Sequence, residues 1–164
     1  MIRYVNKDIV FQEVPGEVSL ALNISSCPYH CDGCHSPYLR EDIGEDLERD
    51  LPALLDRYGS GITCVLFLGE GKDFGALIRC MDLVSKRHLK TAVYTGMDIP
   101  PDIKDEDVMF YAAMLALPDY VKFGSYQKEL GGLASPTTNQ RMYRYNADTE
   151  HYEDITHLFW RKPE

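Results

Sequence analysis

Residues 18–37 read VSLALNISSCPYHCDGCHSP. The first part, VSLALNIS, is an apolar run that follows Gly16 and ends at a cysteine-rich segment, a pattern typical of a buried β-strand. The second part places Cys27, Cys31 and Cys34 within eight positions, with the spacing C-x3-C-x2-C. Thiols clustered this tightly select soft metals, so the sequence predicts a metal site directly after a core strand.

The rest of the chain alternates between strand-like and helix-like segments. This alternation predicts an α/β fold of parallel strands with helices outside. Ligands in such folds gather at the carboxyl ends of the strands. We therefore expect the cysteine segment, GEG (69–71), TG (95–96) and GSY (124–126) to meet on one rim. The further strands are expected over 61–69, 90–96 and 119–126, and the helices over 45–59, 73–88 and 105–116.

Two of these helices carry features that bear on their packing. In 73–88, Asp73 is the expected N-cap. In 45–59, Pro52 weakens the middle of the helix or shifts its start. The apolar residues of 73–88 recur at helical spacing and are expected to face the core; they are Phe74, Leu77, Ile78, Met81 and Val84.

The two ends of the chain lack this alternation. We expect a hairpin or an edge strand over 3–14, a loop over 127–140 and a polar hairpin over 141–156 that turns at NADTE. The sequence contains no internal repeat or linker, so we expect a single domain over 1–164.

Composition excludes several classes of protein. The formal net charge of −9 argues against a nucleic-acid partner, because binding to phosphates needs clustered Lys and Arg. The chain has no long apolar run and no signal-like N-terminus, so we expect no membrane association and a cytoplasmic location. In that compartment disulfides are disfavoured, and Cys64 and Cys80, in apolar stretches, are expected to be small core residues.

The three clustered cysteines are one ligand short of a closed metal site. A structural zinc ion normally has four protein ligands, and His30 or His35 would have to supply the fourth. A four-iron cluster needs one ligand per iron, so three cysteines leave one iron open to another ligand. The compact triplet at a strand end favours the [4Fe-4S] cluster, with zinc as the alternative.

The C-x3-C-x2-C segment after the first apolar strand resembles that of the radical S-adenosylmethionine (SAM) enzymes. The resemblance covers roughly 18–145 and implies an incomplete (β/α) barrel that is open on one side. It also implies that Cys27, Cys31 and Cys34 hold a [4Fe-4S] cluster whose open iron binds SAM. CDGCHSP (31–37), GGLASPTTNQRMY (131–143) and the small size resemble most closely the activating enzymes of anaerobic ribonucleoside-triphosphate reductases.

The resemblance also implies contacts to SAM. Many superfamily members have an aromatic residue before the last cysteine, where this chain has Gly33, so the implied adenine contact passes to the backbone of Gly33, Cys34 and His35. The family's Gly-Gly-acid segment corresponds to LGEGKD (68–73), in which Gly69 and Glu70 match best and Asp73 is the alternative acid.

Two weaker segments complete the implied site. VYTG (93–96) resembles the family's third-strand end and makes Thr95 a further expected SAM contact. TTNQR (137–141) is either an ordinary polar turn or part of the face toward a partner.

The implied chemistry is reductive cleavage of SAM followed by hydrogen abstraction from a glycine of a partner protein. The implied partner is the large subunit of anaerobic ribonucleoside-triphosphate reductase, and the implied reductant is a protein such as flavodoxin. Few residues remain to build walls around a small substrate, which also favours a protein loop as substrate. The alternatives are an activase of another glycyl-radical enzyme, such as pyruvate formate-lyase, and a non-catalytic zinc or iron–sulfur interaction module.

Overall fold

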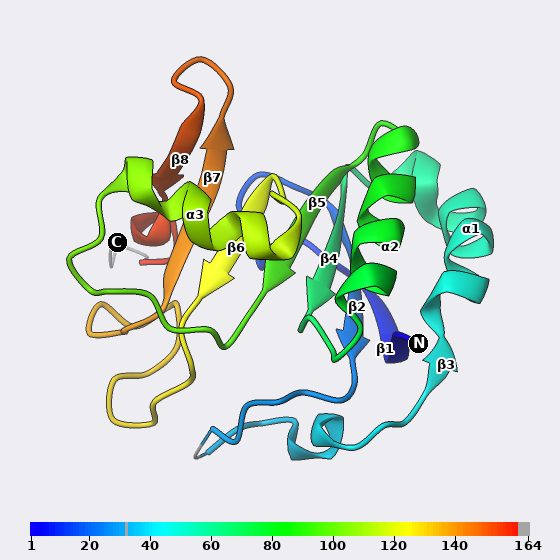
Figure 1. Ribbon diagram of the computed structural model, residues 1–164, viewed down its shortest axis with the longest axis horizontal. Helices are drawn as coiled ribbons and strands as arrows, with labels where there is room; N and C mark the ends of the chain where they lie inside the picture. Colours follow the sequence, from blue (N-terminus) through cyan, green and yellow to red (C-terminus); the bar gives the residue numbers. More distant parts are fainter. Residues whose placement is uncertain (32, 161–164) are drawn as a thin grey trace.

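The computed structural model describes residues 1–31 and 33–160. These residues form a mixed sheet with the strand order β3-β1-β2-β4-β5-β6-β7-β8 (Figure 1). The strands are β1 (Arg3–Val10), β2 (Ser19–Ile24), β3 (Glu45–Asp46), β4 (Cys64–Leu68), β5 (Lys90–Tyr94), β6 (Tyr120–Phe123), β7 (Arg141–Asn146) and β8 (His151–Asp154).

The centre of the sheet is parallel. Strands β2, β4, β5 and β6 lie side by side in chain order, and each pairs in parallel with the next. Parallel neighbours need a crossover connection between them. The crossovers contain α1 (Leu47–Tyr58), α2 (Phe74–Lys86) and α3 (Val108–Ala112), as the alternation in the sequence predicts.

The sheet has antiparallel strands on both sides of this centre. Strand β1 pairs with β2 and also with the two-residue β3, which forms the edge. The predicted N-terminal strand is therefore confirmed, but it lies inside the sheet rather than at its edge. The predicted C-terminal hairpin is confirmed as β7 and β8, and β7 pairs antiparallel with β6.

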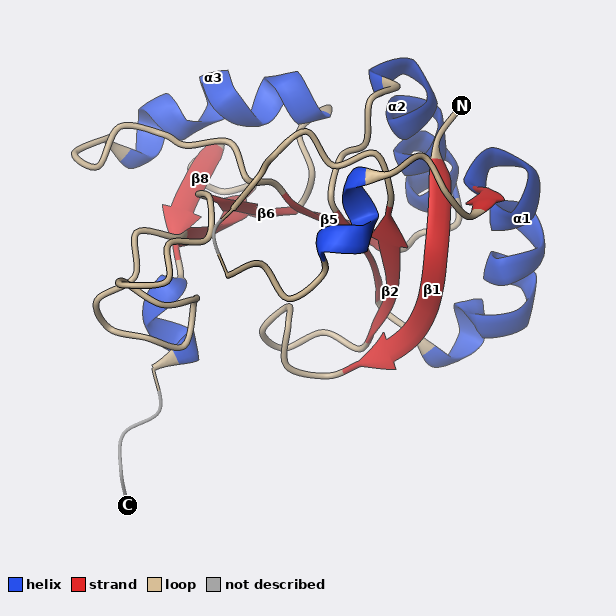
Figure 2. Cartoon of the chain, turned by 90° about the horizontal axis from the view of Figure 1, so that it is seen from below, coloured by secondary structure: helices blue, strands red, loops and turns tan. Residues whose placement is uncertain are grey.

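The three α-helices cover one face of the sheet (Figure 2). The larger core lies between them and the strands; Leu22, Phe67 and Val93 from the sheet pack there with Leu51 and Leu77 from the helices. The opposite face carries a smaller apolar cluster that includes Ala21, Leu66 and Met142. No helix within the described residues is both long and apolar enough to cross a bilayer.

Helix α2 begins as the sequence predicts but presents a different face to the core. The Asp73 side chain accepts a hydrogen bond from the Ala76 backbone N–H at 3.0 Å, which confirms the N-cap. Leu77, Met81 and Val84 are buried as expected, whereas Phe74 and Ile78 are each 48% exposed. The expected core face was wrong for these two because the sheet contacts the side of the helix that carries Ala76 and Cys80.

Candidate functional site

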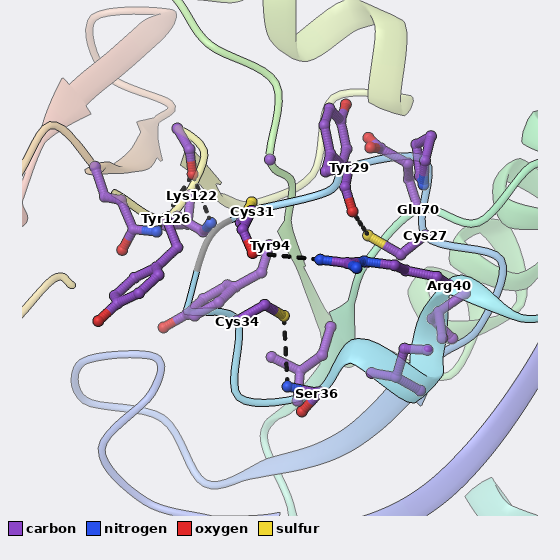
Figure 3. Close-up of a pocket in the computed structure, with 18 residues that line it drawn as sticks. Cys27, Tyr29, Cys31, Cys34, Ser36, Arg40, Glu70, Tyr94, Lys122 and Tyr126 are labelled. Atoms are coloured by element: carbon purple, nitrogen blue, oxygen red, sulfur yellow. Dashed lines mark hydrogen bonds between the residues drawn. The ribbon is translucent and has the colours of Figure 1, made fainter. Parts of the chain in front are cut away.

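A cavity of about 180 Å³ lies at the carboxyl ends of the four parallel strands (Figure 3). All four segments that the sequence places on this rim contribute to its wall, which confirms that prediction. The wall includes Cys27, Cys31, Cys34, Gly69, Glu70, Gly96, Lys122, Gly124 and Tyr126.

The described residues of the cysteine loop, 26–31 and 33–36, cross this rim without regular secondary structure. Its first part is held by backbone hydrogen bonds: the Ser26 N–H donates to Glu41 O at 3.0 Å and the Cys27 N–H to Leu39 O at 2.8 Å. Farther along, the guanidinium of Arg40 donates to Cys31 O at 3.3 Å. These contacts bring the loop back over the strand ends and keep its thiols at the cavity.

The thiols of Cys27, Cys31 and Cys34 are free and partly buried. Among residues 1–31 and 33–160, no three His, Cys, Asp or Glu side chains lie close enough together to hold a metal ion. Burial raises the pKa of the Cys27 thiol above its usual value, an effect that the neighbouring Cys31 and Cys34 reinforce. Because a metal binds the thiolate, metal binding here releases protons.

A buried carboxylate stands on the next part of the wall. Glu70 is 2% exposed, and the hydroxyl of the fully buried Thr95 donates to its Oε2 at 2.7 Å. Asp73, the alternative acid, instead caps α2 and binds the terminal ammonium of Met1 at 2.6 Å. Of the two acids, Glu70 is therefore the one that the fold places at the cavity.

The turn after β4 needs glycine to bring Glu70 to this position. Gly69 has φ of +110°, a left-handed conformation that residues with a side chain rarely adopt. A Cβ at Gly69 would make an ordinary contact of 3.4 Å with Ile24 O, so the backbone conformation is the reason for glycine here. The pairing of Gly69 N–H with Tyr94 O at 3.0 Å holds the turn against the end of β5.

Lys122 is a cavity residue that the sequence interpretation missed. It is 8% exposed and donates from Nζ to Gly124 O at 3.1 Å, and its ammonium lies 5.5 Å from the centre of the Tyr94 ring. Burial lowers the pKa of Lys122 to about 8, and the electrostatic attraction of Cys31 and Glu70, which would raise it, only partly offsets this. A lysine inside the apolar stretch of β6 was the signal that could have drawn attention to it.

Arg40, which follows the cysteine loop in the 3₁₀ helix Pro37–Arg40, adds a second cation to the wall. Its Nε atom is buried and has no hydrogen-bond partner among the described residues. Buried polar atoms are normally paired. The Nε–H of Arg40 is therefore an unmet hydrogen-bond donor inside the wall of the cavity.

Of the expected SAM contacts, Cys34, Gly69 and Glu70 line the cavity, whereas Gly33, His35 and Thr95 do not. A Cβ at Gly33 would meet the Tyr126 ring at 3.4 Å, and the His35 ring is centred 5.7 Å from that of Tyr126. Thr95 contacts Glu70 from behind and does not itself line the cavity. From the segment TTNQR, Gln140 lines the cavity and donates from Nε2 to Gly124 O at 3.3 Å.

Replacing Lys122 by methionine is expected to stabilise the metal-free chain at neutral pH. Folding lowers the pKa of Lys122 from 10.5 to about 8, because a buried ammonium destabilises the folded chain. This loss of stability is complete below about pH 8 and disappears as the pH rises toward 10.5, the pKa in the unfolded chain. The variant should exceed the native chain in free energy of unfolding by about 1–3 kcal/mol at pH 7. Urea denaturation should show a smaller difference near pH 9.5; a constant or reversed difference would contradict the assignment of a buried charge.

The arrangement joins three soft thiol donors, one buried carboxylate and two cations around a single cavity. Gathered around one point, these thiols would suit a thiophilic metal, while the carboxylate and the cations would suit a ligand that carries both an ammonium and a carboxylate group. Comparison of the chain with protein-family models, with curated proteins and with solved structures finds no match in any of the three.

Proposed function

We propose that this chain is a radical SAM activating enzyme that generates a glycyl radical on the large subunit of anaerobic ribonucleoside-triphosphate reductase. One observation carries the proposal: the three thiols of C-x3-C-x2-C share a cavity with Glu70 and Lys122 at the carboxyl ends of four parallel strands. In a zinc-binding interaction module, the thiols would have no need of a buried carboxylate and a buried lysine in the same cavity.

The donor set fits a [4Fe-4S] cluster. Cys27, Cys31 and Cys34 would be its ligands, and their chemistry suits iron–sulfur binding. Because the thiols are not gathered around one point, loading requires part of the cysteine loop to move. After Cys31, both Gly33 and His35 lie at the surface.

The cavity also fits the amino-acid end of SAM. The Glu70 carboxylate would accept hydrogen bonds from an ammonium group, while Arg40 and Lys122 would bind a carboxylate. Ile24, Leu39 and Leu68 add apolar wall that excludes water from this end of the site. When bound, a reduced cluster and SAM would supply a carbon-centred radical for hydrogen abstraction, and the role of these side chains would be to hold and orient the two groups.

The partial barrel, the protein substrate and the cytoplasmic location belong to the same proposal. Four parallel strands with helices on one face provide a scaffold for a site that a partner's loop closes from outside. A loop of the reductase large subunit would bring its glycine to the rim, and flavodoxin or a similar protein would supply the electron.

Anaerobic reconstitution with iron and sulfide tests the proposal. We expect about four irons and four sulfides per chain and release of 5′-deoxyadenosine from SAM under reducing conditions. One zinc per chain without sulfide would contradict the proposal and favour the interaction module. Electron paramagnetic resonance on mixtures with candidate large subunits would show which one acquires a glycyl radical, and so separates a ribonucleotide reductase activase from one of the pyruvate formate-lyase type.

A further inference from the structure

Tyr29 lies between the first two cysteines, and its side chain stands beside Glu70 at the cavity (Figure 3). Its hydroxyl lies 3.4 Å from Thr95 Oγ1, the same oxygen that hydrogen-bonds to Glu70. Its backbone carbonyl accepts from the Cys27 thiol at 3.7 Å. Tyr29 therefore contacts both the Cys27 thiol and Thr95, the residue that hydrogen-bonds to Glu70.

The ring of Tyr29 sits directly on Gly96. A Cβ built on Gly96 would lie 2.7 Å from Tyr29 Cγ and 2.8 Å from Cδ2, distances that real Cβ atoms essentially never show. Gly96 has no positive φ that would require glycine. The close approach of the ring is thus the physical reason why this position has no side chain.

The two ends of the cysteine loop differ in how they are held. Cys27 is fixed by its N–H bond to Leu39 O and by the seated Tyr29. Beyond Cys31, the hydrogen bonds found for Cys34 among the described residues lie within the loop: its N–H donates to Cys31 O, and its sulfur accepts from the Ser36 N–H at 3.4 Å. The first cysteine is therefore fixed to the 3₁₀ helix Pro37–Arg40 and to the turn after β5, whereas the last depends on contacts inside the loop.

We propose that Tyr29, seated on Gly96, is a positioning residue that fixes Cys27 at the rim and couples the cysteine loop to Glu70 and Thr95. The role of the loop as a cluster site rests on the proposed function, whereas the fixing of Cys27 does not. Through this contact, a ligand that engages Glu70 also acts on the segment that carries the thiols.

Alkylation of the metal-free chain directly tests whether the contact between the Tyr29 ring and Gly96 fixes Cys27. We expect Tyr29→Ala and Gly96→Ala each to raise the rate at which iodoacetamide modifies Cys27 by about tenfold, because each opens the same local contact. Mass spectrometry locates the modified cysteine, and protection of the buried Cys64 and Cys80 shows that the chain stays folded.

A double variant separates a shared contact from two independent effects. Because Tyr29 and Gly96 act through one contact, the double variant should react about as fast as either single one. A rate equal to the product of the two single effects, or unchanged rates in both singles, would overturn the proposal. Tyr38→Ala is the matched control, since Tyr38 follows the same loop but is 43% exposed, and it should alkylate like the native chain.

Iron and sulfide content after anaerobic reconstitution gives a second readout. Tyr29→Ala and Gly96→Ala should hold less cluster than the native chain, and Tyr29→Phe, which keeps the ring on Gly96, should recover most of the loading. A Tyr29→Phe variant that loads as poorly as Tyr29→Ala would overturn the role of the seated ring. If the native chain itself binds no cluster, the proposed function fails, while the alkylation pattern still decides whether Tyr29 fixes Cys27.

Discussion

Replacement of Cys31 by alanine is expected to reduce both cluster content and SAM cleavage to the background level. Cys31 lies in the middle of the triplet, and its loss leaves two thiols at the cavity, too few for the three irons that the protein would have to hold. Iron and sulfide analysis, visible absorption and 5′-deoxyadenosine release after reconstitution measure the effect. Full cleavage activity in this variant would refute the ligand assignment.

Cys64→Ala is the matched control for Cys31→Ala. Cys64 is fully buried in β4, and burial raises the pKa of its thiol to about 12, so it does not offer a thiolate to a metal. The control should keep the cluster and the activity, with a small loss of stability from the missing sulfur atom. Loss of the cluster in Cys64→Ala would show that Cys64 was wrongly assigned to the core and takes part in cluster binding.

Phe67→Ala is expected to destabilise the fold strongly. Phe67 is fully buried in β4 and packs in the larger core beneath the helices. Removing the ring leaves a cavity and should lower the free energy of unfolding by about 3–5 kcal/mol. Urea denaturation of the metal-free chain measures this loss as a lower transition midpoint.

Phe74→Ala removes the same side chain from a very different environment. Phe74 lies at the start of α2 and is 48% exposed, so its replacement should change the free energy of unfolding by less than about 1 kcal/mol. Equal losses in the two variants would mean that α2 turns a different face to the sheet.

The sequence pattern predicts the strands and the rim because both follow from local composition and from general rules of chain connection. The apolar run over 18–25 becomes β2, and the glycine-bounded run over 61–69 becomes β4. Their parallel pairing brings Cys27 and Glu70 to one cavity even though they are far apart in the chain. The order of the parallel strands is therefore sufficient to predict that Cys27 and Glu70 lie close together.

Neither the buried face of α2 nor the position of Lys122 near the thiols could be predicted in the same way. Helical spacing fits several overlapping faces of α2, and only the position of the sheet decides that Ala76 is buried and Ile78 exposed. Lys122 appears in the sequence as one charge within a strand, and its direction depends on how β6 pairs with β5 and β7. The seat of Tyr29 on Gly96 is a contact between two loops, and local pattern carries no information about it.

The wall that faces the thiols comes from late in the chain, with Lys122 on β6 and Gln140 just before β7. During synthesis, Cys27, Cys31 and Cys34 emerge from the ribosome long before these residues. Arg40 emerges soon after the thiols, but Glu70, Lys122 and the ends of β4, β5 and β6 follow only later. Under the proposed function, cluster insertion is therefore expected to follow translation, after the chain has folded.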